Sequence, residues 1–446
     1  MTLVDKDLKY IWHPCSQMKD YEEFKPIIIK RGQGIYLYDI NGKSYADAVS
    51  SWWCNLLGHS NKRINKALAE QVNKIEHVIF SNFSNVPAIE LCEKLDKLLP
   101  AGLEKFFFTD NGSAAVEACL KMSFHYHMLS GNKTKTKFMA LTNAYHGETI
   151  GALSVTDLDI YSKMYKPLMV DVIRVQGPDC YRCKYHKKRE SCQAECFEHV
   201  EKAIAEHGTE VASFIVEPLV QAAAGMKIYP PCYLKKLRTI CTNNNIHLIA
   251  DEIAVGYGRT GKMFACDHAG ISPDMMCLSK GLSGGYMPLA LAVTTKEIYN
   301  MFYGDYSEGR AFLHSHTYSG NAMGCAVAVE VLKILEEDNI IEQCQEKAKL
   351  FNSMIVDALQ NHKYVGEIRS IGLINAIELV KDKQTKIPFN YQQRIGYQIY
   401  RKAVEKGLLL RPLGDVLYFN PPLITTTDDM KFMIDVCVQS INEVLK

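Results

Sequence analysis

The strongest constraint on the fold is an alternation of short apolar runs with longer amphipathic stretches, from about residue 60 to residue 325. The runs lack the polar alternation of half-exposed strands, so they predict strands buried on both faces. The stretches between them have apolar residues at three- and four-residue spacing and predict helices. This pattern indicates an α/β fold with a large, mostly parallel sheet. The predicted strands include residues 105–109, 137–141, 214–217, 246–250 and 275–278, and the predicted helices include 114–129 and 233–243.

The two ends of the chain have a different pattern, in which short strands mix with helices. Near the N-terminus, residues 33–49 predict a hairpin with a turn at Asn41-Gly42. A chain of 446 residues is also too long for one simple core. We therefore predict a smaller α+β domain, formed by residues 1–60 and 326–446, beside a large domain of residues 61–325. The elements predicted after residue 326 are helices at 327–337 and 391–406 and strands at 368–379 and 416–420.

Two residues with complementary chemistry stand at the ends of predicted strands. Asp251 follows the run 246–250, and Lys280 lies just after the run 275–278. Ligands of mostly parallel sheets bind beyond the C-terminal ends of the strands, where both side chains would lie. There, a lysine amine can react with the aldehyde of pyridoxal phosphate, and a carboxylate can keep the ring nitrogen of that cofactor protonated. Taken singly, the two residues are better explained as a surface lysine and a helix-capping aspartate, but the surrounding motifs favour the cofactor site.

The loop after the predicted strand 105–109 has the properties of an anion site. Its sequence is Asp110-Asn111-Gly112-Ser113, and it opens the predicted helix 114–129. Gly112 allows the backbone to approach a ligand closely, and Ser113 offers a hydroxyl beside the positive end of a helix dipole. An ordinary serine N-cap is the alternative. Together with Lys280 and Asp251, this loop is predicted to hold the phosphate of the cofactor.

Tyr145 and Ile253 are predicted to contact the cofactor ring from its two faces. Tyr145 lies in the polar segment Tyr145-His146-Gly147-Glu148 after the run 137–141, where its ring could stack on the pyridine. A strand-end aromatic packed in the core is the alternative. Ile253 comes two residues after Asp251, so its side chain would point the same way on a strand. We place Tyr145 with Lys280 and Asp251 among the predicted catalytic residues.

Charge and composition exclude several classes of partner. The net charge is +1, from 51 basic and 50 acidic residues, which argues against a nucleic-acid surface or a polybasic membrane surface. No apolar stretch is long enough for a membrane span, and the first residues lack the pattern of a signal peptide. We therefore expect a cytoplasmic protein that acts on small molecules and whose 15 cysteines remain thiols.

One cluster stands out from the scattered cysteines: Cys180-x2-Cys183-x8-Cys192-x3-Cys196. Four cysteines at this density could hold zinc. However, the spacing of the second pair is loose, and residues 184–190 between the pairs are strongly charged. These features favour a surface excursion stiffened by packed thiols. We accordingly predict no metal ion and keep zinc as the lesser alternative.

These motifs together resemble the class III, or ω-amino, aminotransferases, which have fold type I of the pyridoxal phosphate enzymes. The resemblance covers essentially the whole chain. It implies that pyridoxal 5′-phosphate is the cofactor and that the protein is a homodimer with both active sites at the interface. It also implies that His316 and Thr317 reach the phosphate held by the other subunit. The matching blocks are Asn111-Gly112-Ser113, Tyr145-His146-Gly147, Glu217-Pro218, Asp251-Glu252-Ile253 with residues 256–261, Ser279-Lys280-Gly281, Gly284-Gly285 and residues 317–321.

Three further blocks resemble the branch of the family that acts in biotin biosynthesis: Trp12-His13-Pro14, residues 50–59 and Leu410-Arg411-Pro412. This resemblance implies transfer of an amino group from S-adenosylmethionine to 8-amino-7-oxononanoate, which gives 7,8-diaminononanoate. The keto acid has a long chain ending in a carboxylate, which Trp52 would cover and Arg411 would bind. A structural Arg411 paired with Asp415 is the alternative. The residues expected to line the substrate site are Trp52, Trp53, Tyr145, Lys280, Ser315 and Arg411.

One position departs from the family pattern. Cys15 stands where the family usually has an aromatic residue after Trp-His-Pro, and this departure bears on the fit of the amino donor rather than on the cofactor chemistry.

Three alternative functions stay open. The first is the same reaction with lysine as the amino donor, and the second is another class III activity, such as an ornithine or 4-aminobutyrate transaminase. A third is a non-catalytic sensor of a phosphorylated ligand. The combination of Lys280 and Asp251 argues against the sensor.

Overall fold

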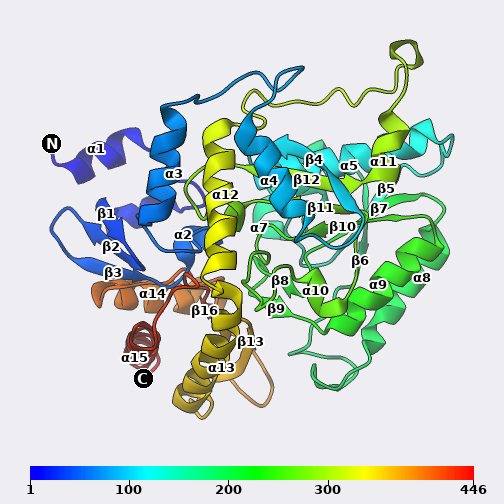
Figure 1. Ribbon diagram of the computed structural model, residues 1–446. Coiled ribbons are helices and arrows are strands. Elements are labelled where there is room, and N and C mark those ends of the chain that lie inside the picture. The colour runs from blue at the N-terminus through cyan, green and yellow to red at the C-terminus, as the bar shows by residue number, and fades with distance from the viewer.

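A seven-stranded sheet occupies the middle of the chain in the computed structural model, which describes residues 1–446 (Figure 1). In order across the sheet, its strands are β4 (Leu103–Thr109), β12 (Ala290–Thr295), β11 (Met275–Leu278), β10 (His247–Asp251), β7 (Val211–Val216), β5 (Lys137–Leu141) and β6 (Val172–Val175). β12 is antiparallel to both of its neighbours, and the other ladders are parallel. The predicted α/β fold with a mostly parallel sheet is confirmed.

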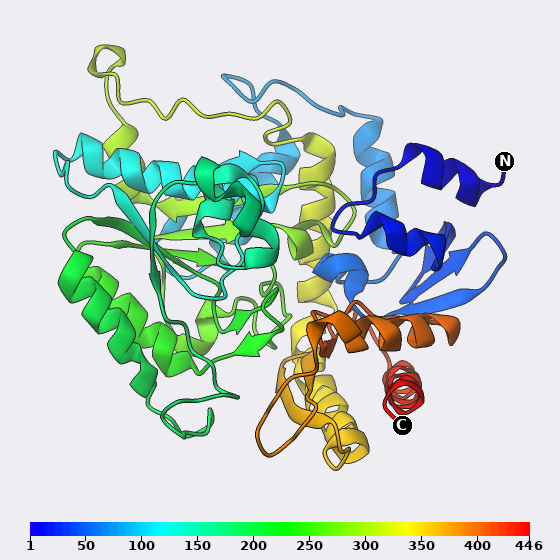
Figure 2. The same ribbon diagram turned by 180° about the vertical axis from the view of Figure 1, so that it is seen from behind.

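Helices cover both faces of this sheet (Figures 1 and 2). α5 (Gly112–Leu129) packs on one face in an apolar cluster that includes Ile249. α9 (Pro231–Asn243) packs on the other face in the cluster that includes Leu248, because successive side chains of a strand point to opposite faces. With both faces covered, every residue of β7, β10 and β11 is buried. This double burial explains why these strands are continuous apolar runs in the sequence.

Each of the five predicted strands lies in this sheet: 137–141 and 275–278 have the predicted bounds, and the ends of the other three differ from the prediction by at most three residues. β12 and β6 are not among the predicted strands. β12 (Ala290–Thr295) is rich in alanine and threonine, and it returns antiparallel beside β11. It therefore lacks the run of large apolar residues that marks the other central strands.

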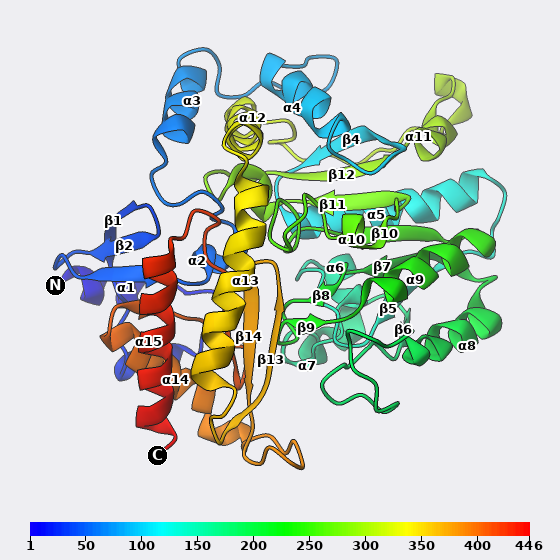
Figure 3. The same ribbon diagram turned by 60° about the horizontal axis from the view of Figure 1, so that its bottom comes forward.

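Both ends of the chain build two smaller sheets. The first has the order β1 (Ile29–Gln33), β2 (Tyr36–Asp39), β3 (Ser44–Asp47) and β15 (Leu408–Leu409), so N-terminal and C-terminal segments pair directly. The second has the order β13 (Val365–Ile371), β14 (Ile374–Leu379) and β16 (Val416–Phe419). Figure 3 shows the terminal segments beside each other, to one side of the large sheet. The predicted α+β region from both termini is thus present.

Two predictions for the ends are wrong in detail. The strand predicted at 368–379 is a hairpin, because Gly372, with a φ of +55°, turns the chain between β13 and β14. The helix predicted at 391–406 begins only at Ile395, since Arg394 has a φ of +49° that cannot continue a right-handed helix. The predicted hairpin of residues 33–49 is present, with β2 antiparallel to β3.

The boundary predicted after residue 325 falls inside α12 (Ala322–Glu337), and the division into residues 1–60, 61–325 and 326–446 stays a prediction.

None of the helices combines the length and the apolar composition that a membrane span requires. β8 (Val220–Gln221) and β9 (Lys227–Ile228) form a small separate ladder. The remaining helices are α1 (Leu3–Tyr10), α2 (Ser50–Trp53), α3 (Lys62–Val72), α4 (Val86–Asp96), α6 (Ile150–Val155), α7 (Asp159–Ser162), α8 (Glu198–His207), α10 (Cys266–Ala269), α11 (Lys296–Phe302), α13 (Ile340–Leu359), α14 (Ile395–Glu405) and α15 (Thr427–Val444).

Candidate active site

A cavity of about 150 Å³ opens at the C-terminal edge of the large sheet. β10 ends there at Asp251, and β11 is followed there by Ser279 and Lys280. The N-terminus of α5 forms another side of the cavity. The residues predicted for the site that line this cavity are Trp53, Gly112, Ser113, Tyr145, Asp251, Ile253 and Lys280.

Lys280 presents its amine to the cavity from a strained backbone. Its φ is +44°, in the left-handed region that residues other than glycine rarely adopt. Burial lowers the pKa of the Lys280 amine below its ordinary value, and the charge of Asp251 partly opposes this shift. The Lys280 Nζ atom also lies 4.6 Å from the ring centre of Trp53. A larger share of this amine is therefore neutral, and nucleophilic, than for a lysine in water.

Asp251 is paired with a histidine from a distant part of the chain. His146 Nδ1 lies 2.7 Å from Asp251 Oδ2, and both side chains are buried. The backbone N–H of His146 donates to Thr156 Oγ1 at 3.0 Å, which helps to hold the imidazole in place. The other carboxylate oxygen of Asp251 accepts from the N–H of Ile253 at 3.1 Å. His146 Nε2 is buried without a partner, so one polar atom of the cavity wall is left for a ligand or water.

A second buried carboxylate, Glu217, lies in the same cavity at the end of β7. Its oxygens accept from the N–H groups of Tyr145 at 3.0 Å and Ala222 at 2.9 Å. Burial raises the pKa of Glu217 to about 7, although His146 and these N–H groups pull it down. Glu217 can therefore exist in either protonation state near neutral pH.

The N-terminus of α5 is open to an anion because two glycines keep it clear. A Cβ at Gly112 would lie 2.9 Å from Ile253 Cδ1. A Cβ at Gly147, where φ is +130°, would lie 2.1 Å from Ser113 Oγ. Asn111 caps the helix, and its side-chain oxygen accepts from the N–H of Ala114 at 3.0 Å. The hydroxyl of Ser113 and the first N–H groups of α5 are placed as a phosphate site requires.

Trp52 and Arg411 lie together, outside the residues that line the cavity. The guanidinium carbon of Arg411 is 4.4 Å from the ring centre of Trp52, a cation–π contact. Arg411 Nη2 also donates to the carbonyl of Cys15 at 3.2 Å. Arg411 forms no ion pair with Asp415, whose carboxylate accepts from the N–H of Gly396 at 3.2 Å. The alternative in which Arg411 is held by Asp415 is therefore not supported.

The Cys15 side chain lies close to the carboxylate of Glu148, beside Trp52 and Arg411. Its Sγ atom lies 3.8 Å from Glu148 Oε1, which also accepts from the Tyr145 hydroxyl at 2.8 Å. Burial raises the pKa of Tyr145, and the bond to Glu148 raises it further, so the hydroxyl stays protonated and donates. Burial and the charge of Glu148 also raise the pKa of the Cys15 thiol. We name the group formed by Cys15, Trp52, Tyr145, Glu148 and Arg411 the mouth of the site.

Three more of the predicted residues do not line this cavity within one chain. Ser315 and Thr317 are exposed, and neither lines the cavity. His316 pairs through Nδ1 with Asp110 of the same chain, just before the Gly112-Ser113 loop. All three lie in the extended segment between α11 and α12, which runs along the outside of the molecule (Figures 1 and 2).

His146 and Glu217 are cavity residues that the sequence motifs contained but did not mark as site residues. Glu217 had a usable signal, since it is a carboxylate that ends the apolar run 211–216 at the ligand-binding edge of the sheet. His146 had a weaker one, its place in the polar segment after Tyr145. Its pairing with Asp251 spans 105 positions and has no counterpart in local sequence.

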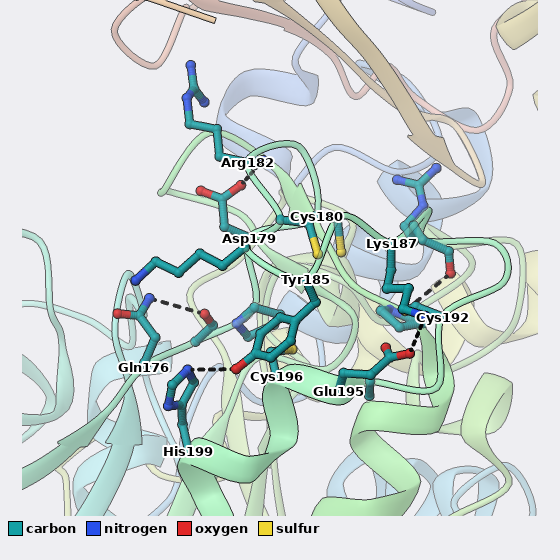
Figure 4. A pocket seen from close by; sticks show the side chains of 17 residues that line it. Gln176, Asp179, Cys180, Arg182, Tyr185, Lys187, Cys192, Glu195, Cys196 and His199 are labelled. Carbon is teal, nitrogen blue, oxygen red and sulfur yellow. Dashed lines mark hydrogen bonds and ion pairs between the residues drawn. The ribbon is translucent and has the colours of Figure 1, made fainter. Parts of the chain in front are cut away.

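A smaller cavity of about 60 Å³ lies next to the four clustered cysteines (Figure 4). Cys180, Cys183, Cys192 and Cys196 are free and half-buried there, among charged side chains such as Lys187 and Glu195. No group of three or more His, Cys, Asp or Glu side chains is arranged to hold a metal ion. The surface excursion stiffened by packed thiols stays a prediction. Burial raises the pKa of Cys180 to about 12, so this thiol is protonated at neutral pH.

Comparisons with known proteins cover nearly the whole chain. Residues 17–444 match the family described as Aminotransferase class-III. The adenosylmethionine-8-amino-7-oxononanoate aminotransferase of Helicobacter pylori is 43% identical over 449 residues, with 99% of this chain and 98% of the relative covered. The crystal structure of the protein of that name from Methanocaldococcus jannaschii is 41% identical, with a TM-score of 0.94 and coverage of 99% of this chain and 98% of the other. An omega transaminase from Pseudomonas jessenii, solved in complex with PMP, is 34% identical with a TM-score of 0.94, covering 100% and 98% of the two chains.

The cavity also fits pyridoxal phosphate on the chemistry of its own residues. Lys280 offers an amine of lowered pKa for the aldehyde, Asp251 offers a carboxylate for the ring nitrogen, and Gly112 and Gly147 leave room for a phosphate at α5. The lysine, the carboxylate and the helix N-terminus of this one cavity are the three groups that the cofactor requires. The family match, the full-length relatives and this cavity agree, and the chain belongs to the class-III aminotransferase family, whose cofactor is pyridoxal 5′-phosphate.

Proposed function

We propose that this enzyme transfers an amino group to 8-amino-7-oxononanoate and forms 7,8-diaminononanoate for biotin biosynthesis, with S-adenosylmethionine as the amino donor. The observation that carries the proposal is the set of relatives, from several bacterial and archaeal species, that are 40–43% identical over nearly their full length and have the same name. The mouth supports it, since it places a flat aromatic ring and a guanidinium side by side, 4.4 Å apart. Tryptophan can cover an aliphatic chain, and arginine can bind the carboxylate at its end.

The cofactor would be held by residues of the cavity. Asp251 would pair with its ring nitrogen, Ile253 and Tyr145 would flank the ring, and Gly112 and Ser113 would bind the phosphate at the N-terminus of α5. When bound, pyridoxal phosphate supplies an aldehyde that takes up an amino group and a ring that withdraws electrons from the neighbouring carbon.

Two residues would then handle the protons. Lys280 Nζ would hold the aldehyde of the cofactor, and its free amine would act as the base that takes the proton from the amine-bearing carbon of the donor. Its lowered pKa favours the neutral base that this role requires. Asp251, held by His146 at 2.7 Å, would keep the ring nitrogen protonated through both halves of the reaction.

The site needs to accept two unlike substrates in turn, and the mouth is suited to that. Trp52 and Trp53 present aromatic faces, which attract a sulfonium cation or cover an apolar chain. Arg411 is placed to bind a carboxylate from either substrate, while Glu148 gives the same region one negative charge. Lysine as donor remains the second candidate. Cys15, which stands where the family usually has an aromatic residue, bears on how either donor fits.

We further propose a homodimer with both sites at the interface. Support comes from large apolar side chains that are exposed in the single chain on two segments: Ile79 is 63%, Phe83 64%, Leu313 90% and Tyr318 60% exposed. Burial of such side chains on a second copy would stabilise the pair. Ser315, His316 and Thr317 lie on one of these segments and would be brought to the partner's phosphate site. A cytoplasmic location is part of this proposal and is consistent with 15 free cysteines.

Separate half-reactions test the proposed function. The purified holoenzyme is mixed with S-adenosylmethionine or with lysine alone, and the visible absorption band of the cofactor is followed. We expect S-adenosylmethionine to bleach the band and 8-amino-7-oxononanoate to restore it. Bleaching by lysine only would replace the donor, and bleaching by ornithine or 4-aminobutyrate without a response to the oxononanoate would favour another class III activity. A colourless protein that does not take up the cofactor would contradict the enzyme as a whole.

A further inference from the structure

A left-handed turn holds the two adjacent tryptophans at the active site. The residues of α2 (Ser50–Trp53) have φ angles of +50°, +45°, +73° and +71° in chain order. Ser51 and Trp52 also have ψ angles of +53° and +45°, so they lie in the left-handed helical region. Residues other than glycine adopt this conformation only at an energetic cost, and four in succession require support from their surroundings.

Asp47 holds the turn through both its backbone and a side chain. It ends β3 and is fully buried, with an exposed fraction of 0%. One carboxylate oxygen accepts from the N–H of Val49 at 3.2 Å and of Ser51 at 3.0 Å. The other accepts from the Ser51 hydroxyl at 2.7 Å and from His59 Nε2 at 3.0 Å. No lysine or arginine pairs with Asp47, so its hydrogen-bonding capacity is directed to the turn and to His59.

The turn sends its two tryptophans to different parts of the site. Trp53 is 4% exposed, its ring centre lies 4.6 Å from Lys280 Nζ, and its indole N–H donates to the Tyr418 hydroxyl at 2.9 Å. Trp52 is 40% exposed and stacks on Arg411. The buried guanidinium of Arg259 holds the far end of the turn, because it donates to the carbonyl of Trp53 at 3.1 Å. The positions of both rings therefore depend on one strained segment anchored at both ends.

We infer that Asp47 is a positioning residue, which fixes Trp52 and Trp53 relative to Lys280 and Arg411 by holding residues 50–53 in the left-handed turn. Without the charge-assisted acceptor, the turn relaxes towards right-handed or extended backbone and both rings move. The consequence for substrate binding rests on the proposed function, since it assumes that the rings cover the chain of the keto acid. The consequence for the rings themselves does not.

The chain offers both a reporter and a matched control. It has three tryptophans, so Trp12→Phe leaves only the pair of the turn to fluoresce. Asp39→Asn is the control, because Asp39 is also buried in the same small sheet and accepts from Asn41 N, Lys43 N and the Tyr45 hydroxyl. Those bonds hold a hairpin turn away from the site, so the control reproduces the structural cost of the change without touching the tryptophans.

The experiment compares Asp47→Asn with Asp39→Asn, both in the Trp12→Phe holoenzyme. We expect Asp47→Asn alone to make the tryptophans more accessible to acrylamide quenching. It should also raise KM for 8-amino-7-oxononanoate about tenfold with a smaller change in kcat, as expected for loss of one charge-assisted bond. If Asp47→Asn matches the control in quenching and in KM, the inference is overturned.

Two further results separate the possible failures. Should Asp47→Asn not fold, Ser51→Ala removes one of the same hydrogen bonds from an exposed residue, and it must shift quenching and KM in the same direction with a smaller size. Unchanged quenching in Ser51→Ala would then overturn the inference. If the wild-type enzyme does not use the oxononanoate at all, the proposed function fails, while the quenching comparison still decides whether Asp47 holds the tryptophans.

Discussion

The cofactor cavity and the mouth beside it are built in opposite ways. Asp251 and Glu217 are buried and Lys280 is half-buried, and each lies at the end of a central strand of one sheet. The mouth instead joins Cys15 and Trp52 from the N-terminal part with Arg411 from the C-terminal part, and Trp52 is 40% exposed. The residues that line the cavity in a single chain come from these strand ends and from the N-terminus of α5, whereas the predicted Ser315 and Thr317 remain at the surface of that chain.

We relate the cavity to the chemistry of the reaction and the mouth to the choice of substrate. A buried site at a rigid sheet edge can shift pKa values, as it does for Lys280 and Glu217, because water is excluded there. A mouth made of surface segments can change its side chains with little effect on the core. Cys15 is such a change, in a position where the family usually has an aromatic residue. We therefore expect substitutions in the cavity to stop the reaction and substitutions in the mouth to alter which substrate is used.

Lys280→Ala should have the largest effect. It removes both the amine that reacts with the aldehyde and the proposed base, so we expect turnover to fall by about 10⁴-fold or more. Circular dichroism and size-exclusion chromatography should show an unchanged fold. Lys262→Ala is a suitable control, because its amine bonds only the backbone carbonyl of Asp267. Wild-type turnover in Lys280→Ala would contradict the assignment of the cavity.

Asp251→Asn should retain the cofactor and lose most of the activity, by about 10²–10³-fold. An amide cannot keep the ring nitrogen protonated, and it also weakens the bond to His146. The absorption band of the bound cofactor should shift, which gives a readout independent of turnover. Near-normal rates with an unshifted band would mean that another residue pairs with the ring nitrogen. They would also contradict the expectation that substitutions in the cavity stop the reaction.

Glu217 should make stability depend on pH. Burial raises its pKa to about 7 from an ordinary 4.5, so between these values the folded state holds a proton that the unfolded chain releases. Its contribution to the free energy of unfolding is full below about pH 4.5 and is lost as pH rises through 7, at most about 3 kcal/mol. Denaturant unfolding at several pH values should show a flatter profile for Glu217→Gln. Glu252, whose pKa burial also raises to about 7, gives a matched comparison outside the cavity. If Glu217→Gln keeps the wild-type slope, the carboxylate does not titrate in this range.

Arg411→Ala tests the mouth directly. We expect a loss of about 2 kcal/mol in binding of the keto acid, or about 30-fold in KM, because a carboxylate loses its charged partner. The cofactor band and the fold should be unaffected, in contrast to the two cavity variants. Each half-reaction is measured separately, since S-adenosylmethionine also carries a carboxylate. Normal handling of the keto acid with reduced heat stability would show that Arg411 has only a structural role at Trp52.

The smallest signal should come from mixed dimers of Thr317→Ala and Lys280→Ala chains. If each site takes Lys280 from one chain and Thr317 from its partner, a mixed dimer has one site with both defects and one with neither. Turnover of the mixed dimer, measured against cofactor concentration, should then show the cofactor affinity of the wild-type enzyme, because its one active site has both residues, whereas the Thr317→Ala dimer should show a weakened affinity. Subunit exchange is followed independently with labelled chains. A mixed dimer with the weakened cofactor affinity of the Thr317→Ala dimer would place Thr317 in the site of its own chain.

The residues of the cofactor site could be predicted from the sequence alone. Continuous apolar runs specify strands buried on both faces, and such strands can only form a sheet covered by helices, with ligands at the C-terminal edge. Lys280, Asp251 and the Gly112-Ser113 loop therefore had predictable places, since each is adjacent in sequence to its strand. Glu217 followed the same rule and could have been marked by it.

The long-range contacts of the site and the turn at residues 50–53 follow only from the tertiary structure. The pairs His146–Asp251 and Arg411–Cys15 join residues 105 and 396 positions apart, and no local pattern specifies such contacts. The left-handed turn at residues 50–53 opposes the backbone preference of serine and tryptophan, so local propensity predicts against it. It exists because Asp47 and Arg259 hold both of its ends. Local sequence sets what each strand end carries, but long-range packing sets which strand ends, turns and termini meet, and here it supplies the energy that keeps Trp52 and Trp53 in a conformation they would not adopt alone.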